Sequence, residues 1–133
     1  MKIVPISILI PYFIDKNSLS LWMQKRVSND ELNGLLEFPG GKIENGETPI
    51  TACCREVAEE VGVKLREKDL ELFKLYPYDY GDKTVLLNVF LYDNSNGEFP
   101  HEMSHIIEEN FESELKVPKA NFRIIKDLKS YLV

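Results

Sequence analysis

Apolar residues dominate the first part of the chain, where residues 6–14 read ISILIPYFI. A run of this kind, closed by the turn-forming residues DKNS at 15–18, predicts a buried β-strand. In the segment LSLWMQKR that follows, Leu19, Leu21 and Met23 occupy alternate positions, which places them on one face of a second strand. The short polar connection between the two strands predicts an antiparallel hairpin.

A helix is predicted in the middle of the chain from its end signals. Thr48 can cap the free amide groups of a first helical turn, and Pro49 suits the first helical position. Gly62 favours a C-terminal cap, so the helix is expected to end near Val61. The apolar positions recur at intervals of four, three and four residues and form the stripe that would face a core: Ile50, Cys54, Val57 and Val61.

The second half of the chain returns to strands. Two strands joined around Gly81 and Asp82 are predicted from the segments ELFKLYPYDY and TVLLNVFLYD, and a last short strand from SHIIEE. Asn121 is expected to cap a terminal helix whose apolar face consists of Phe122, Ile125, Leu128 and Leu132. Because strands and helices interleave, the chain is expected to form one layered α/β domain over residues 1–133.

Composition and charge narrow the function classes. With 133 residues, 44% of them apolar, the chain is long enough to bury one hydrophobic core. Its net charge of −6 argues against binding to a nucleic-acid polymer, which normally requires a basic face. The apolar start is too short to span a bilayer, and the adjacent Cys53 and Cys54 are poorly placed for a disulfide or a zinc site, so both are expected to be buried thiols. These features favour a cytoplasmic protein with no membrane partner.

The stretch REVAEEVG at 55–62 carries acidic side chains at the end of the predicted helix. Carboxylates are unfavourable there, because the helix dipole places partial negative charge at this end. Glu56, Glu59 and Glu60 fall within an arc of about 100° on the helix surface, where their oxygen atoms suit Mg²⁺ or Mn²⁺. The alternative is a solvated acidic helix face. The glycine-rich segment FPGG ahead of the helix favours the metal site, because glycine permits a close approach of backbone to ligand.

The same region matches a known family signature. From Gly41 the chain reads Gly41, five residues, Glu47, seven residues, and then REVAEEVGV up to Val63. This resembles the Nudix box, G-x5-E-x7-R-E-U-x-E-E-x-G-U, at each defined position. The resemblance implies an α/β/α sandwich with a mixed sheet and a loop–helix at the box. It also implies a Mg²⁺-dependent hydrolase that acts on a nucleoside diphosphate linked to another group, with Mn²⁺ as a substitute.

The resemblance implies roles for individual residues of the box. Arg55 would orient the box carboxylates, and Glu47 would hold the loop against the helix. Gly41 and Gly62 would keep structural positions. Glu59 ranks first among the carboxylates that would hold the metal and carry the catalysis. The expected metal ligands in the box are the side chains of Glu56, Glu59 and Glu60 and the backbone carbonyl of Gly40.

Outside the box, the segments LLEFPGGKIENGETP and VPKAN resemble the MutT-type branch, the 8-oxo-dGTP diphosphatases that sanitise nucleotide pools and so assist DNA repair. Asn121 is similar to the asparagine of that branch that hydrogen-bonds the edge of an oxidised guanine. An amide suits this task because it offers both an acceptor and donors, and a simple helix cap is the alternative. Lys83 stands where the branch has an arginine. The resemblance places these further residues at the substrate: Arg26, Phe38, Tyr80 and Lys83.

A base that takes the proton of the attacking water is also needed. Glu102, in FPHEMSH, is expected to fill this role and to add a metal ligand, by resemblance to the glutamate that MutT-like enzymes supply from this loop. The alternatives are Glu98, Glu108 and Glu109. His101 and His105 flank Glu102, and without matching cysteines they are expected on the surface rather than in a zinc site.

Three functions remain open from the sequence. The first is a MutT-like pyrophosphohydrolase that converts nucleoside triphosphates, (8-oxo-)dGTP in particular, to the monophosphate and pyrophosphate. The second is a Nudix hydrolase for oxidised pyrimidine nucleotides, ADP-ribose or dinucleoside polyphosphates. The third is an inactive nucleotide-binding module, which the complete set of box carboxylates argues against. The expected partner is a small nucleotide, and the protein is expected to be a monomer or a homodimer.

Overall fold

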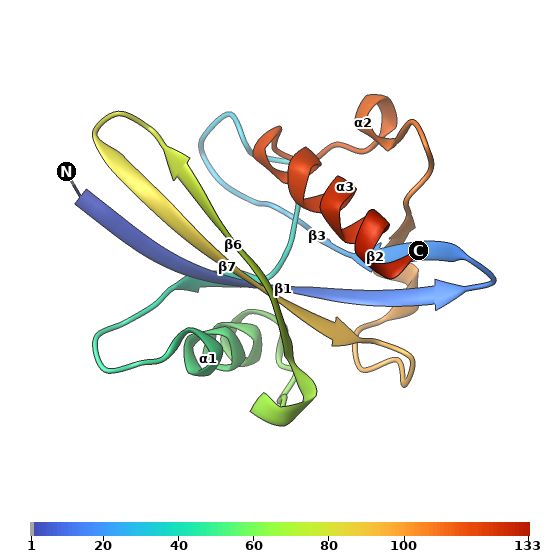
Figure 1. Ribbon diagram of the computed structural model, residues 1–133, viewed down its shortest axis with the longest axis horizontal. Coiled ribbons are helices and arrows are strands. Elements are labelled where there is room, and N and C mark those ends of the chain that lie inside the picture. Colours follow the sequence, from blue (N-terminus) through green and yellow to red (C-terminus); the bar gives the residue numbers. More distant parts are fainter. Residues whose placement is uncertain (1) are drawn as a thin grey trace.

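The computed structural model, which describes residues 2–133, is built around one mixed sheet (Figure 1). The strands of this sheet are β1 (Lys2–Asp15), β2 (Ser18–Trp22), β5 (Gly40–Lys42), β6 (Glu71–Asp79), β7 (Lys83–Asp93) and β8 (Ser104–Ile106). They lie in the order β6-β7-β1-β2-β8, and β5 pairs with β1 beside β2. β1 runs parallel to β7 and antiparallel to β2 and β5. The predicted α/β class with a mixed sheet is therefore confirmed.

The two longer helices cover opposite faces of this sheet (Figure 1). Successive side chains of a strand point to opposite faces, and in β1 Ile10 packs with the cluster under α3 whereas Leu9 packs with the cluster under α1. Among residues 2–133, no helix combines the length and apolar character needed to cross a membrane. The other elements are α1 (Pro49–Val61), α2 (Phe111–Glu114), α3 (Ala120–Leu132), the short strands β3 (Gln24–Lys25) and β4 (Leu36–Glu37), and the 3-10 turns η1 (Glu67–Asp69) and η2 (His101–Met103).

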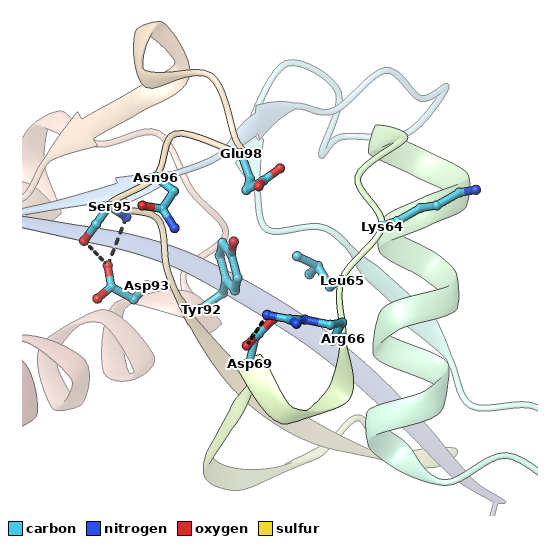
Figure 2. A pocket seen from close by; sticks show the side chains of 9 residues that line it. All are labelled: Lys64, Leu65, Arg66, Asp69, Tyr92, Asp93, Ser95, Asn96 and Glu98. Carbon is cyan, nitrogen blue, oxygen red and sulfur yellow. Dashed lines mark hydrogen bonds and ion pairs between the residues drawn. The ribbon is translucent and has the colours of Figure 1, made fainter.

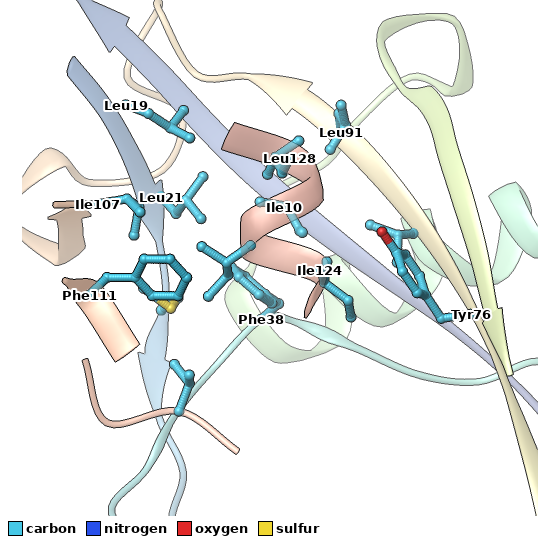
Figure 3. Close-up of a cluster of buried hydrophobic side chains, with 14 residues drawn as sticks. Ile10, Leu19, Leu21, Phe38, Tyr76, Leu91, Ile107, Phe111, Ile124 and Leu128 are labelled. Atoms are coloured by element: carbon cyan, nitrogen blue, oxygen red, sulfur yellow. The ribbon is translucent and has the colours of Figure 1, made fainter. Parts of the chain in front are cut away.

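The larger core cluster lies between the sheet and α3 (Figure 3). Ile124 and Leu128 of α3 pack there against Leu21 of β2 and Phe111 of α2. The second cluster lies under α1 and includes Trp22, whose ring is 5.1 Å from that of Phe99. The buried Trp22 Nε1 has no hydrogen-bond partner within the part of the chain that the structure describes.

β1 extends beyond the predicted 6–14 and passes through two prolines. Its ladder changes partner along one edge, where residues 6–8 pair with β5 and residues 12–15 pair with β2. The N–H of Leu9 donates to the carbonyl of Pro39 on this edge. Successive N–H groups of a strand point to opposite edges, so every second residue points the same way as Leu9. Pro5 and Pro11 therefore face this same edge, beyond the two ends of the β5 pairing, and the ladder with β7 on the other edge of β1 loses no donor to them.

The predicted hairpin between the first two strands is confirmed. Lys16 and Asn17 form its turn with φ of 49° and 69°, the left-handed geometry that matches the twist of a tight hairpin. Leu19, Leu21 and Met23 are all buried on the α3 side, as their alternation predicts.

α1 has the predicted bounds. The Thr48 side chain accepts a hydrogen bond from Thr51 N at 3.2 Å, and the chain leaves the helix at Gly62 with φ of 79°. The predicted stripe is wrong at one position, because Cys53 is fully buried and Cys54 is only partly buried. In its contact with the sheet, α1 buries the residue three positions after Ile50, Cys53, instead of the residue four positions after it, Cys54.

The predicted cap of α3 is wrong. The helix begins at Ala120, and the residue in the cap position is Lys119, which makes no side-chain capping hydrogen bond. Asn121 lies inside the first turn, where its backbone N–H donates to the carbonyl of Pro118 at 2.9 Å. Its side-chain amide is therefore available for another task.

Candidate active site

β5 brings the box loop into contact with β1 and α1. A Cβ atom on Gly40 would lie 2.1 Å from the carbonyl oxygen of Ser7, and one on Gly41 would lie 2.5 Å from the carboxyl carbon of Glu56. Both separations are shorter than van der Waals contact allows. Gly40 meets backbone and therefore must be glycine, whereas a Cβ on Gly41 would displace the Glu56 carboxylate. Ser7 Oγ also donates to the carbonyl of Pro49 at 2.7 Å, which ties the start of α1 to β1.

Arg55 connects the box loop with the carboxylates of α1. Its Nε and Nη2 donate to the two carboxylate oxygens of Glu47 at 2.6 and 2.9 Å, a bidentate pair of high geometric specificity. Nη2 also donates to the carbonyl of Lys42 at 3.1 Å. On the other side, Nη1 donates to Glu56 Oε1 at 2.9 Å and to Glu59 Oε2 at 3.3 Å.

The charges of the Arg55–Glu47 pair are mutually stabilised. Hydrogen bonds from Arg55 and from the backbone N–H of Glu44 lower the pKa of Glu47 to about 2. The hydrogen bond to Glu47 raises the pKa of Arg55 above its ordinary value, and the hydrogen bond to Glu56 adds a smaller increase. Both groups therefore stay charged at neutral pH, and the guanidinium keeps its orientation toward the helix carboxylates.

Glu60 lies at the exposed end of α1, and its surroundings raise its pKa. Desolvation raises its pKa, and hydrogen bonding from Gln24 and from the backbone of Gly40 opposes that shift. Gln24 Nε2 donates to Glu60 Oε2 at 2.9 Å. The sequence did not single out Gln24, because only the pairing of β3 with β4 brings it opposite Glu37 and beside the helix.

The chemistry of these side chains suits a divalent cation. Glu56 and Glu60 lie beside the backbone of β5, so that hard oxygen donors gather on one side of α1. In the part of the chain that the structure describes, no three acidic, His or Cys side chains are already arranged as a metal cage. Arg55 Nη1 instead contacts one oxygen each of Glu56 and Glu59. The Glu59 side chain is 61% exposed and has room to turn toward a cation.

Glu102 lies in the exposed turn η2, next to the edge of the sheet. Met103 accepts a backbone hydrogen bond from Met23 N at 3.2 Å, and the chain continues from Met23 to Gln24 and so to Glu60. This bond joins η2 to the segment that carries Gln24, the hydrogen-bond partner of Glu60. The two flanking histidines lie apart from each other, His101 against the ring of Phe13 at 5.3 Å and His105 in β8.

A cleft of about 640 Å³ opens near the first turn of α3. Four of the five residues expected at the substrate line it together, although they come from three distant segments: Arg26, Tyr80, Lys83 and Asn121. Lys83 Nζ lies 6.0 Å from the centre of the Tyr80 ring. Tyr78 of β6 is a further lining residue that sequence reasoning missed, although it stands only two positions before Tyr80.

Phe38 does not line this cleft. Its side chain is only 6% exposed and belongs to the core cluster under α3, so its expected contact with substrate is corrected to a packing role. The side-chain amide of Asn121 has no hydrogen-bond partner within the described residues. Arg26 is occupied, because its guanidinium donates to Asp30 at 3.3 Å and to Glu37 at 3.4 Å.

The cleft and the box loop are connected through the strand pairing of β1 with β5. Ile6 lines the cleft and pairs in the ladder with Lys42, the residue after Gly41. A second connection runs from Arg26 to Glu37 through a side-chain bond and from Glu37 to Gln24 through the β3–β4 pairing. Gln24 in turn donates to Glu60.

Figure 2 shows a second cleft, of about 620 Å³, between the segment after α1 and the end of β7. Lys64 and Arg66 lie on one wall and Glu98 on the other, and Tyr92 reaches into it from β7. Burial, followed by the nearby Glu98 and Asp69, raises the pKa of Tyr92. The other glutamates considered as bases, Glu108 and Glu109, line shallow clefts around α2.

The mixed sheet, the helices on its two faces and the loop–helix with its acidic side chains define an α/β protein of the Nudix class. A family model described as the NUDIX domain matches residues 5–128, and the chain belongs to the Nudix family. The 8-oxo-dGTP diphosphatase of Escherichia coli (strain K12) is 37% identical over 78 residues, which are 59% of this chain and 59% of that protein. The 8-oxo-dGTP diphosphatase of Buchnera aphidicola subsp. Schizaphis graminum is 30% identical over 129 residues, 95% of each chain.

Solved structures support the same fold. A MutT structure from work on Aliivibrio salmonicida and Vibrio cholerae covers 98% of this chain and all of its own, with 23% identity and a TM-score of 0.70. An Ap4A hydrolase of C. elegans covers 98% of this chain and 99% of its own, with 14% identity and a TM-score of 0.69. At these identities the likeness concerns the fold alone.

Proposed function

We propose that the protein uses Mg²⁺ to hydrolyse a nucleoside triphosphate, (8-oxo-)dGTP in particular, to the nucleoside monophosphate and pyrophosphate. The observation that carries this proposal is the adjacency of two parts. A cleft with the free amide of Asn121 and the carboxylates of the box helix lie on either side of the Ile6–Lys42 pair. A nucleotide bound with its base in the cleft would direct its phosphates across β5 toward α1.

The box residues would hold the metal and fix its surroundings. Glu56, Glu59 and Glu60 would supply side-chain oxygens, and the carbonyl of Gly40 would add a backbone oxygen. When bound, the metal neutralises the polyphosphate and positions the attacking water. Mn²⁺ would substitute, because it accepts the same oxygen donors.

Arg55 and Glu102 would complete the reaction centre. Arg55, fixed by Glu47, keeps Glu56 and Glu59 on one side of the helix while the cation binds between the carboxylates. Glu102 would take the proton of the attacking water, since it lies on the turn η2, which is bonded to the segment that leads to Gln24 and Glu60.

The cleft residues would select the base. The Asn121 amide can accept and donate hydrogen bonds at the same time, which suits the mixed edge of an oxidised guanine. Tyr80 and Lys83 would border the base from the β6–β7 turn. Arg26 would reach the nucleotide only after releasing Asp30 or Glu37. The relatives named 8-oxo-dGTP diphosphatase support this choice of base.

In this role the protein would act on free nucleotides in the cytoplasm, as a monomer or a homodimer, and would remove oxidised precursors before DNA synthesis. The E. coli relative is matched over only 59% of its length, so its substrate is carried over here as part of the proposal.

The test is hydrolysis by the purified protein, with Mg²⁺, of a panel that contains 8-oxo-dGTP, dGTP, CTP, ADP-ribose and a diadenosine polyphosphate. We expect the highest kcat/KM for the guanine nucleotides, with monophosphate and pyrophosphate as products. The matched control is Glu59→Gln, which separates the activity of this protein from that of a contaminant. Turnover of ADP-ribose with both guanine nucleotides untouched would refute the proposed substrate while leaving the hydrolase assignment intact.

A further inference from the structure

Tyr78 makes a hydrogen bond that the reaction itself does not require. Its hydroxyl donates to the carbonyl of Ala120 at 2.8 Å and so joins β6 to the first residue of α3. The next residue in the chain is Asn121, which lines the cleft and whose amide has no hydrogen-bond partner among residues 2–133. Tyr78 also lines the cleft itself, so the anchor and the amide lie within one small region.

The start of α3 has few other side-chain anchors. The cap residue Lys119 makes no side-chain capping bond, and the first turn relies on backbone bonds from Asn121 to Pro118 and from Phe122 to Lys119. A helix end without a side-chain cap is less firmly fixed than a capped one. The Tyr78 hydroxyl therefore supplies, from the sheet, a restraint that the local sequence of the helix lacks.

A second tyrosine of β6 makes a hydrogen bond to a side chain further along the same helix. Tyr76 Oη donates to Asp127 Oδ2 at 2.8 Å, and the rings of Tyr76 and Tyr78 are nearly parallel, at 11° and 6.5 Å between centres. Tyr76 does not line the cleft. Both tyrosines thus anchor α3, Tyr78 through a backbone carbonyl beside Asn121 and Tyr76 through a carboxylate about two turns away from it.

We propose that Tyr78 is a positioning residue that sets the orientation of the Asn121 amide, and through it the choice of base. The inference rests on the proposed function, in which Asn121 reads the base. By holding the carbonyl of Ala120, Tyr78 fixes the backbone from which the amide projects. Because a misplaced amide loses its hydrogen bonds to the base but leaves the phosphates in position, the effect falls on substrate affinity rather than on the chemical step.

The experiment compares Tyr78→Phe with Tyr76→Phe, each alone and in an Asn121→Ala background. Tyr78→Phe is expected to raise KM for 8-oxo-dGTP about fivefold, the scale of one neutral hydrogen bond, with kcat nearly unchanged. Tyr76→Phe is expected to lower the melting temperature at least as much without changing KM, because its bond is to a charged carboxylate. In the Asn121→Ala background the effect of Tyr78→Phe on KM is expected to vanish, because residues that act through one another are not additive.

A second readout is independent of catalysis. In nitrogen-15 NMR spectra of the free protein, the side-chain amide signals of Asn121 are expected to move in Tyr78→Phe and to stay in place in Tyr76→Phe. Equal effects of the two variants on KM and on these signals would overturn the inference, as would an undiminished effect of Tyr78→Phe in the Asn121→Ala background. If the wild-type protein hydrolysed no nucleotide, the proposed function would fail, and the NMR comparison would still decide whether Tyr78 positions Asn121.

Discussion

The two halves of the candidate site are constructed differently. All the partners of Arg55 lie within residues 42–59, in one loop and one helix. The cleft instead takes Arg26 from the segment after β3, Tyr80 and Lys83 from the β6–β7 turn, and Asn121 from α3. The geometry of the box is therefore encoded locally, whereas that of the cleft depends on the sheet register and on how α3 docks. Substitutions in the box should change the chemistry, and substitutions in the cleft should change selectivity.

The largest effect is expected in the box, from Glu59→Gln. This change keeps the size of the side chain and removes the charge that would hold the metal, so kcat should fall about 10²- to 10³-fold, as for the loss of other groups that stabilise charge in a transition state. Steady-state kinetics with 8-oxo-dGTP measure this, and circular dichroism checks the fold. Glu31→Gln, an exposed glutamate in the loop before β4, is the matched control and should keep full activity. Near-normal turnover by Glu59→Gln would contradict the metal assignment.

A smaller and more selective effect is expected in the cleft. Asn121→Ala removes an amide that would make two hydrogen bonds to the base, so the preference for guanine over cytosine nucleotides should fall about tenfold or more. The ratio of kcat/KM values for 8-oxo-dGTP and CTP is the measurement. Asn96→Ala, in the loop after β7, is the control and should leave that ratio unchanged. Equal losses for every base would mean that Asn121 does not read the base.

Mg²⁺ should stabilise the folded protein even without nucleotide. At about ten times its Kd, a cation that binds only the native state adds about 1.4 kcal/mol to the free energy of unfolding. Thermal melts with and without Mg²⁺ should therefore differ by a few degrees, and Glu60→Gln should reduce that difference. An unchanged melting temperature in millimolar Mg²⁺ would show that the box carboxylates do not bind the cation on their own.

The smallest expected effect concerns pH. The pKa of Glu47 is lowered from 4.5 to about 2, so its carboxylate contributes stability above pH 4.5, and this contribution is lost as the pH falls toward 2. Urea unfolding at about pH 6 and about pH 3 should show a steeper loss for the wild type than for Glu47→Gln. Glu44→Gln is the control, because that carboxylate is 68% exposed and lies 3.8 Å from Arg55. Parallel pH profiles for wild type and Glu47→Gln would contradict this assignment.

The contrast between box and cleft also explains what the sequence could predict. The bounds of α1 follow from three local signals: a threonine cap, a proline at the first position and a glycine at the end. Each signal acts within one helical turn of its own position. The burial of Cys53 rather than Cys54 was not predictable, because spacings of three and four residues both fit one helix face, and only contact with the sheet distinguishes them.

The errors outside the box have the same physical origin. Phe38 stands beside the glycines of the box, yet its side chain is directed into the core cluster under α3. Asn121 resembles a helix cap when only its neighbours are considered, whereas the observed start of α3 is held by Tyr78 from a strand more than 40 residues away. Contacts that cross the sheet leave little trace in the local pattern of apolar and polar residues.

Trp22 gives the protein an intrinsic optical probe. It is the only tryptophan of the chain, is 2% exposed, and packs in the cluster under α1 that contains Val57 of the box helix. Its indole emission should shift to longer wavelength when this side of the sheet opens to water, while the larger cluster under α3 contains no tryptophan. Fluorescence therefore reports on the packing of the box helix without any added label, and a comparison with far-ultraviolet circular dichroism would reveal whether the two faces of the sheet unfold together.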